Sequence, residues 1–217
     1  MKSDLQLKKD VTAELEWDPS IDATQVGVSV KDGVVTLSGH LETYVQKYAV
    51  ERAAQRVRGV RGIAVELDVK LDPGHHRSDA EVAAAAEHAL VWHALVPDDR
   101  VQVKVEKGWV TLLGTVNWEY QRREAEKAVR CLTGVVGVSN AITLQPVATP
   151  KNVSDRIREA LTRHADDEAK HIEVVVKDDK VTLRGKVDSW AERAAANTAA
   201  WSAPGVSTVV NELTVQW

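Results

Sequence analysis

The chain has 217 residues, of which 44% are hydrophobic and 28% are charged. That balance is typical of a folded globular protein and argues against a disordered chain, which has fewer apolar residues for its charge. The formal net charge is -4, from 28 basic and 32 acidic residues, and this sign argues against a chain-wide nucleic-acid binder, which would usually be basic.

One unit of sequence occurs three times. The segment GVVTLSG at 33–39 recurs as GWVTLLG at 108–114 and as DKVTLRG at 179–185. The dipeptide Gly-Val at 59–60 keeps the same offsets and recurs at 134–135 and 205–206. Because chance does not hold so many matches in one register, the sequence predicts three tandem units. Their expected bounds are residues 1–71, 76–145 and 149–217.

Each unit begins with a predicted helix. Ser3 and Ser78 fit the capping-box pattern, with glutamine or glutamate three residues later. Apolar residues then follow at helical spacing. They are Leu7, Val11 and Leu15 in the first unit, Val82, Ala86 and Leu90 in the second, and Val153, Ile157 and Leu161 in the third. At the end of the first two helices, Trp17 and Trp92 are expected to cover the edge of the core.

Two strands joined by a tight turn are expected next. In the first unit the valines between residues 26 and 30 alternate with small residues, which is typical of a half-buried strand. The dipeptide Asp32-Gly33 tolerates the positive φ angles of a hairpin turn. The second strand is expected to point Val35 and Leu37 inward. Gly39 is expected to end this strand at a bend or a bulge.

A second helix and a third strand complete the unit. In the first unit this helix is expected over roughly residues 43–58, and Gly59 is expected to cap it in a left-handed conformation. The third strand alternates again between residues 63 and 69. Asn140 and Asn211 replace one of its alternating valines in the other two units, which favours a position near a wet rim.

The order helix, strand, strand, helix, strand predicts an α+β fold. It consists of three tandem αββαβ two-layer sandwich units, each a three-stranded sheet with two helices on one face. One unit of about 70 residues has a small core and is marginal alone. The sequence leaves open whether the units pack against one another or are joined like beads on a string.

The element order, the pattern xGxVxLxG and the later GVxxV resemble the BON domain family. The residues that carry the resemblance are 32–39 with 59–60, 108–114 with 134–135, and 180–185 with 205–206. The resemblance covers nearly the whole chain and implies stress-induced envelope or periplasmic proteins that bind phospholipid surfaces or assist other proteins, without enzymatic activity. Its motifs are turn and core residues, so they specify a fold well and an activity poorly.

The sequence predicts no enzyme, no metal site and no cofactor. Glu51 and Glu126 match each other but meet Asn197 in the third unit, and no charged residue is expected to recur at matching positions in all three units. Histidines stand in the first linker, at 75–76, and beside an acidic run at 164–171, where a solvated loop is favoured because a metal site needs three or four fixed ligands. The single cysteine excludes an intrachain disulfide and a cysteine-based zinc cage.

Aromatic and basic residues gather at the second helix of the second unit. They are Trp118, Tyr120, Arg122, Arg123, Lys127 and Arg130, and Trp190 occupies a nearby position in the third unit. Aromatic rings beside cations form an interfacial membrane anchor. Four cations near anionic lipid would add roughly 4 kcal/mol before losses. Alternatively, the rings cap the junction of sheet and helix, and the cations complement the C-terminus of the helix.

The favoured hypothesis is therefore a non-catalytic, stress-related binding module that docks to anionic phospholipid surfaces through this helix. One alternative is a chaperone-like protein-interaction module that uses sheet edges or exposed tryptophans. Another is a cytoplasmic sensor of an ion or a small ligand. The chain has no run of 18 apolar residues and no visible signal peptide, so a cytoplasmic location is expected. The oligomeric state is left open.

Overall fold

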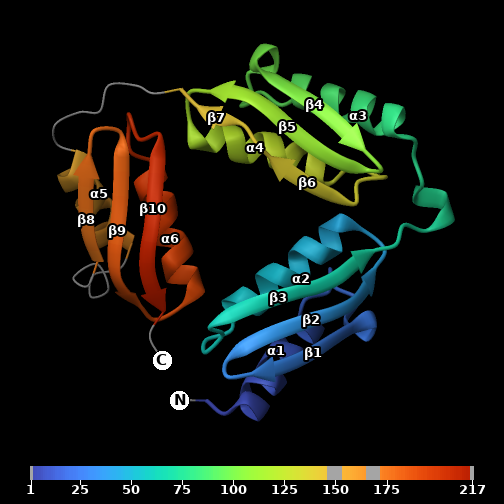
Figure 1. The fold of residues 1–217 in the computed structure, drawn as a ribbon, viewed down its shortest axis with the longest axis horizontal. Coiled ribbons are helices and arrows are strands. Elements are labelled where there is room, and N and C mark those ends of the chain that lie inside the picture. Colours follow the sequence, from blue (N-terminus) through green and yellow to red (C-terminus); the bar gives the residue numbers. More distant parts are fainter. Residues whose placement is uncertain (1, 146–152, 165–171, 216–217) are drawn as a thin grey trace. The chain divides into compact units, whose positions relative to one another are not determined.

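The computed structural model describes residues 2–145, 153–164 and 172–215 and contains three repeats of one αββαβ arrangement (Figure 1). The first repeat consists of α1 (Asp4–Trp17), β1 (Val26–Lys31), β2 (Val34–Leu41), α2 (Tyr44–Arg56) and β3 (Gly62–Val69). The second consists of α3 (Asp79–Val91), β4 (Val101–Glu106), β5 (Trp109–Val116), α4 (Glu119–Arg130), β6 (Gly137–Asn140) and β7 (Thr143–Leu144). The third consists of α5 (Val153–His164), β8 (Ile172–Lys177), β9 (Lys180–Val187), α6 (Trp190–Trp201) and β10 (Thr208–Val215). Short helical turns are η1 (Ala23–Gln25), η2 (Pro73–His75) and η3 (Asp98–Arg100).

The sheets confirm the predicted α+β fold. In each repeat the first two strands form an antiparallel hairpin and the following strand pairs in parallel with the second. The orders are β1-β2-β3, β4-β5-β6 and β8-β9-β10, and β7 also pairs with β5. The two helices of each repeat lie together behind their sheet in the view of Figure 1. The strands β1, β4 and β8 therefore each have one edge without a partner strand among the described residues.

The core of each repeat lies between the sheet and its helices. Leu7, Val11 and Leu15 are buried on α1, and the equivalent residues of α3 are buried as well. On β2, Val35 and Leu37 are completely buried, as the alternation predicts. By their contacts the first two repeats share one compact unit, and the third repeat with residues 117–119 forms the other. The side chain of Leu161 and the segment 165–171, with its acidic run, lie outside the described residues.

The hairpin turn has the predicted backbone conformation, and it also has a hydrogen-bond acceptor that was not predicted. Asp32 and Gly33 have φ angles of 53° and 76°, as expected for a tight turn of this type. Their two N–H groups donate to the carboxylate of Asp4, at 2.8 and 3.0 Å. Asp4 is the first residue of α1, so the helix start holds the turn. Asp79 accepts from the turn of the second repeat in the same way.

Gly39 does not end its strand, and the expected bend or bulge is wrong. The strand β2 continues to Leu41, and the register with β1 and β3 runs through Gly39 without an extra residue. Gly39 instead has a φ angle of 124°, and a Cβ there would lie 2.0 Å from the carbonyl oxygen of Gln25. The glycine is needed because the chain entering β1 passes against it. Gly114 has the same role, against Arg100.

The ends of the second helices also differ from expectation. Gly59 has a positive φ angle of 109°, but α2 already ends at Arg56 with Val57 as its C-cap. Gly59 therefore lies in a further turn, in which the N–H of Val60 donates to the carbonyl of Val57. The glycine serves the turn into β3 and does not cap the helix itself.

Asn140 and Asn211 are half-buried structural residues, and Val65 at the matching position is 39% exposed. Asn140 donates from Nδ2 to the carbonyl of Arg122 on α4 at 2.8 Å, and its Oδ1 accepts from the N–H of Ile142. Asn211 makes the matching bonds to Arg193 and Leu213 in the third repeat. The amide joins strand and helix because it is donor and acceptor at once.

The two tryptophans at the ends of the first helices do not cover the core. Trp17 is 85% exposed and Trp92 is 86% exposed. Each ring follows the last buried residue of its helix, Leu15 or Leu90, by two positions. That spacing turns the side chain away from the buried face of a helix, so the expectation is wrong for a local geometric reason.

Both capping serines are at helix starts, but only one forms the full box. Ser3 accepts from the N–H of Gln6 at 3.2 Å, whereas the Gln6 side chain turns to Asp10. At α3, Ser78 accepts from the N–H of Glu81, and the Glu81 carboxylate accepts from the N–H and the hydroxyl of Ser78. The hydrogen bond from the Ser78 backbone, followed by that from its hydroxyl, lowers the pKa of Glu81.

This lowered pKa predicts that the first turn of α3 loosens in acid. A carboxyl whose folded pKa is depressed contributes stability above its unfolded pKa of about 4.3, and this is lost as the pH falls through the folded value. Amide exchange should show falling protection factors at the start of α3 between pH 6 and pH 3. Glu81→Gln keeps an acceptor oxygen that does not titrate, so its protection should not change over this pH range. Glu87→Gln, on the same helix but outside the box, should behave like the wild type; an equal response of both variants would contradict the prediction.

Candidate functional site

The predicted aromatic and basic residues are divided by α4 between an exposed face and a buried one. Tyr120, Arg123 and Lys127 follow one another at spacings of three and four residues, which places them on one face of the helix. All three are exposed, Tyr120 at 46% and the Lys127 side chain at 63%. We call these three residues the α4 ridge. The opposite face buries Ala125 and Val129 completely.

Trp118 directly precedes α4 and is 37% exposed. Between it and the α4 ridge, Glu119 is only 8% exposed. Trp118 and Tyr120 are thus both accessible on either side of this residue in the chain.

Arg122 does not belong to the ridge. A cation stands at its position in every repeat, as Lys47, Arg122 and Arg193. Lys47 donates to the carbonyl of Leu67 at 2.7 Å, and Arg193 donates to the carbonyl of Leu213 at 3.0 Å. These two carbonyls occupy matching positions of the last strand. Arg122 is half-buried, so we assign it to this structural position. The expectation that no charged residue recurs in all three units is therefore wrong, and comparison at offsets of 75 and 71 residues would have identified this position.

Two further contacts reduce the free positive charge around α4. The guanidinium of Arg130 lies over the ring of Tyr48 at 3.6 Å from its centroid, within the first compact unit. Lys127 approaches Glu124 at 3.4 Å, and Glu124 also lies 3.4 Å from His93. Exposed ion pairs of this kind contribute little, so Lys127 stays available, whereas the stacked Arg130 is removed from the cationic surface.

Trp190 is not part of this surface either. It is the first residue of α6, in the second compact unit, where it is half-buried. The guanidinium of Arg193 lies 5.0 Å from the centroid of its ring. This contact fits the alternative in which an aromatic ring caps the junction of helix and sheet and a cation covers it.

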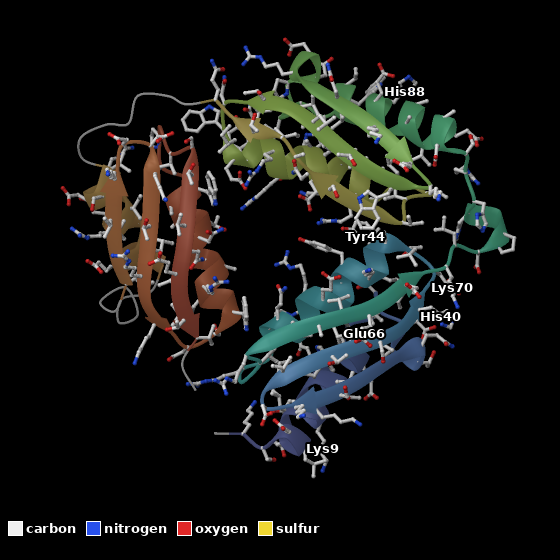
Figure 2. All side chains as sticks on the ribbon, viewed as in Figure 1. Lys9, His40, Tyr44, Glu66, Lys70 and His88 are labelled. Atoms are coloured by element: carbon white, nitrogen blue, oxygen red, sulfur yellow. The ribbon has the colours of Figure 1, made fainter. Side chains whose placement is uncertain are left out.

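The tyrosine at the start of α2 differs from Tyr120 as well. Tyr44, labelled in Figure 2, is half-buried. Burial raises its pKa, and burial likewise raises the pKa of Glu51 on the same helix. At the offset of 75 residues Tyr44 corresponds to Glu119, which is 8% exposed, whereas Tyr120 corresponds to Val45, which is 39% exposed. An exposed tyrosine with two neighbouring cations is specific to α4 among these helices.

The described residues contain no group of three or more histidine, cysteine and acidic side chains able to hold a metal ion. None of the described helices is both long enough and apolar enough to cross a membrane. Cys131, which follows α4, is exposed and unpaired.

Comparison with known proteins identifies a family. The BON domain matches residues 3–70, 78–146 and 151–216. Osmotically-inducible protein Y of Escherichia coli (strain K12) is 29% identical over 141 residues, which cover 63% of this chain and 70% of that protein. Two solved structures of CdsD, a structural protein of the type III secretion system of Chlamydia trachomatis, are 14% and 13% identical, with TM-scores of 0.26 and 0.27. They cover 97% and 100% of this chain, and 92% and 100% of their own; such low scores carry no argument about this chain.

Proposed function

The chain belongs to the BON domain family, and on that premise we propose that it is a non-catalytic, stress-related binding protein that docks to anionic phospholipid surfaces through the α4 ridge. The stress role is supported by the similarity to a protein named as osmotically inducible. The lipid role is supported by one observation in particular. Tyr120, Arg123 and Lys127 are exposed together on one face of an amphipathic helix.

The chemistry of the α4 ridge suits the boundary of a membrane. A tyrosine places an apolar ring and a polar hydroxyl at headgroup depth, and the cations meet anionic lipid. Trp118, which precedes the helix, adds a second ring of the same kind. Arg122 and Arg130 have structural positions, so the exposed cations of the ridge are Arg123 and Lys127, and two cations near anionic lipid contribute roughly 2 kcal/mol before losses. Docking is therefore expected to be weak, reversible and sensitive to salt.

Co-sedimentation with vesicles tests the proposal. The full chain should bind vesicles of equal phosphatidylglycerol and phosphatidylcholine at low ionic strength and should lose most of this binding at about 0.5 M salt. Arg123→Glu combined with Lys127→Glu should weaken the partition roughly tenfold, because two attractions become repulsions. Tyr120→Ala should weaken binding at both salt concentrations, because its ring contributes without charge.

The charge-matched control is Lys31→Glu with Lys70→Glu, two exposed lysines of the first repeat. This variant changes the net charge equally but leaves the α4 ridge intact, so it should bind nearly as the wild type does. If the wild-type protein did not bind anionic vesicles at low salt, the proposed lipid function would be refuted. Equal losses in both double variants would show that net charge is responsible and would remove α4 as the docking helix.

A further inference from the structure

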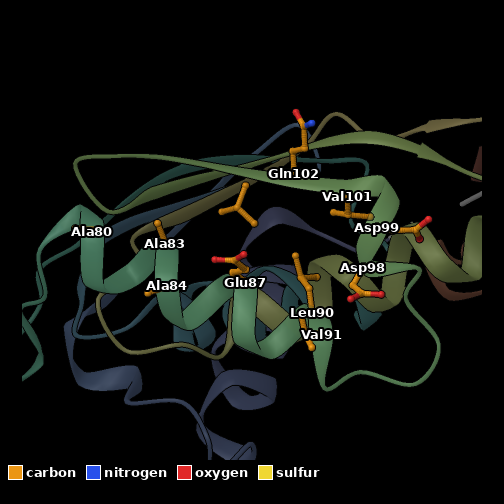
Figure 3. Close-up of a pocket in the computed structure, with 11 residues that line it drawn as sticks. Ala80, Ala83, Ala84, Glu87, Leu90, Val91, Asp98, Asp99, Val101 and Gln102 are labelled. Atoms are coloured by element: carbon orange, nitrogen blue, oxygen red, sulfur yellow. The ribbon is translucent and has the colours of Figure 1, made fainter.

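A groove runs between α3 and the unpaired edge of β4. Its volume is about 710 Å3. Figure 3 shows Ala80, Ala83 and Glu87 along the helix, facing the strand that carries Val101 and Gln102. The side of the groove formed by α3 is shallow because most residues on this face of the helix are alanines, which have short side chains. The strand edge beyond them has no partner strand among the described residues.

The third repeat shows how the same place is closed from within. In that repeat Ser154 and Arg158 on α5 donate to the carbonyl of Val174 on the free edge of β8, at 3.5 and 3.4 Å. The edge carbonyl thus points toward the helix, and two side chains of the helix satisfy it. An unpaired strand edge is a template on which another chain can pair. The third repeat covers part of its own unpaired edge with side chains of α5.

The second repeat lacks both donors. The positions that match Ser154, Arg158 and Val174 are Ala83, Glu87 and Val103. Alanine has nothing to donate, and the Glu87 carboxylate can only accept. Among the described residues, no side chain donates to the carbonyl of Val103. The groove thus presents the acceptor without the hydroxyl and the guanidinium that satisfy it in the third repeat.

The charges that line the groove all have one sign. Glu87 lies midway along it, and Asp98 and Asp99 of η3 lie where β4 begins. No basic side chain lines the groove. Val91, which lines the groove, is 54% exposed, and Trp92 and Leu95, which follow it in the chain, are 86% and 51% exposed. An occupant that complements these features supplies backbone N–H donors along β4, cations near the carboxylates, and apolar side chains at one end.

We propose that this groove binds an extended, cationic segment of another protein, which adds as a strand to the free edge of β4. Main-chain hydrogen bonds give such a complex its affinity, and alternate side chains give it specificity. The guest strand supplies the donor that Ser154 provides in the third repeat, and its lysine or arginine replaces the cation that Arg158 provides there. The site lies on α3 and β4, outside the α4 ridge, so it goes beyond the proposed lipid docking and does not depend on it.

A defined peptide tests the proposal without lipid. The probe is a fluorescein-labelled, amidated peptide of sequence KVKVKVK, titrated against the full chain at low salt and followed by fluorescence anisotropy. Binding should saturate below about 1 mM, and amide exchange should show new protection along β4. A peptide with every backbone amide N-methylated keeps its charge but has no N–H donor for a strand edge, and EVEVEVE reverses the charge. Both should bind at least roughly tenfold more weakly.

Closing the groove as the third repeat does gives the matching protein variant. Ala83→Ser with Glu87→Arg should weaken binding of KVKVKVK at least roughly tenfold. The control Asp68→Arg places the same charge reversal of one carboxylate on the exposed face of β3 and should bind nearly as the wild type does. Because the two peptide controls use unaltered protein, the proposal stays testable if a variant folds poorly.

Three binding results and one exchange result would overturn the proposal. The binding results are the absence of saturable binding, equal affinity for the N-methylated peptide, and an equal loss in Asp68→Arg. Equal affinity for the N-methylated peptide would show that charge attracts the peptide without strand pairing. An equal loss in Asp68→Arg would show that binding depends only on the net charge of the protein. Binding of the peptide that leaves the amides of β4 unprotected would place the ligand elsewhere and would also refute the site.

Discussion

Replacing Gly114 by alanine is expected to lower the free energy of unfolding of the second repeat by about 3 to 5 kcal/mol. Gly114 has a φ angle of 129°, and a Cβ at this residue would lie 2.0 Å from the carbonyl oxygen of Arg100. That oxygen belongs to the backbone and cannot rotate away as a side chain could. Either the start of β4 moves or Gly114 changes its φ angle, and both break the register between β4 and β5.

The small size of the repeat makes this loss decisive. A unit of about 70 residues has only a few kcal/mol of stability of its own, so a loss of this size leaves much of it unfolded at 25 °C. Amide exchange on the full chain measures the effect repeat by repeat. Gly114→Ala should remove protection in β4, β5 and α4. Gly39→Ala should do the same in the first repeat, where the Cβ would meet Gln25 equally closely.

Gly74→Ala is the matched control. Gly74 lies in the short turn η2, and a Cβ there would have no heavy atom within 4 Å. Its φ angle is not among the positive ones, so alanine fits and is expected to leave stability unchanged or slightly raised. If Gly114→Ala unfolded at the same denaturant concentration as Gly74→Ala, the close approach of Arg100 to Gly114 would not require glycine, and the proposed role of Gly114 would be wrong.

The fold could be predicted because the repeat gives every pattern several independent instances. The inward alternation of Val35 and Leu37 and the spacing of Leu7, Val11 and Leu15 are consequences of local periodicity. The role of Gly39 could not be predicted in the same way. Its neighbour Gln25 lies fourteen residues away in the chain, and only the packed hairpin shows that their backbones pass close together.

The candidate site was predicted only in part. Spacing alone places Tyr120, Arg123 and Lys127 on one face of α4. Spacing does not show which neighbouring cations are already engaged, and the stacking of Arg130 on Tyr48 joins two repeats. The sequence did contain the signal that separates Arg122 from the ridge, because the cation recurs in every repeat. A residue that recurs in all three repeats is better explained by the shared scaffold than by the surface of one.

The two proposed surfaces follow from divergence between repeats. Tyr120 corresponds to Val45 and Ala191, so this exposed position carries an aromatic ring in the second repeat and an aliphatic side chain in the other two. Likewise, Ser154 and Arg158 of the third repeat correspond to Ala83 and Glu87, which leave the edge of β4 open. Both differences change the surface of the second repeat, whereas its buried core keeps the pattern of the other two repeats. The second repeat is therefore where binding is expected to concentrate.

Replacing Asp79 by alanine is expected to destabilise the same repeat by about 2 to 3 kcal/mol. Its carboxylate accepts from the N–H groups of Lys107 and Gly108, each at 2.8 Å. Both turn residues have positive φ angles, 51° and 75°, which turn these donors away from the hairpin ladder. The carboxylate also stands in the first turn of α3, where a negative charge is favourable. Alanine removes both effects together.

A graded series separates the hydrogen bonds from the charge. Asp79→Asn keeps one acceptor oxygen and should recover about half of the loss, whereas Asp79→Ala should recover none. Asp72→Ala is the control, because Asp72 precedes the short turn η2 without a capping hydrogen bond from its side chain. Protection of the amides of Lys107 and Gly108 should fall most. The third repeat has Pro150, which carries no carboxylate, at the matching position, and the exchange of its turn amides should be unchanged. Equal destabilisation by Asp72→Ala, or unchanged protection at the turn in Asp79→Ala, would show that the helix start does not hold the hairpin.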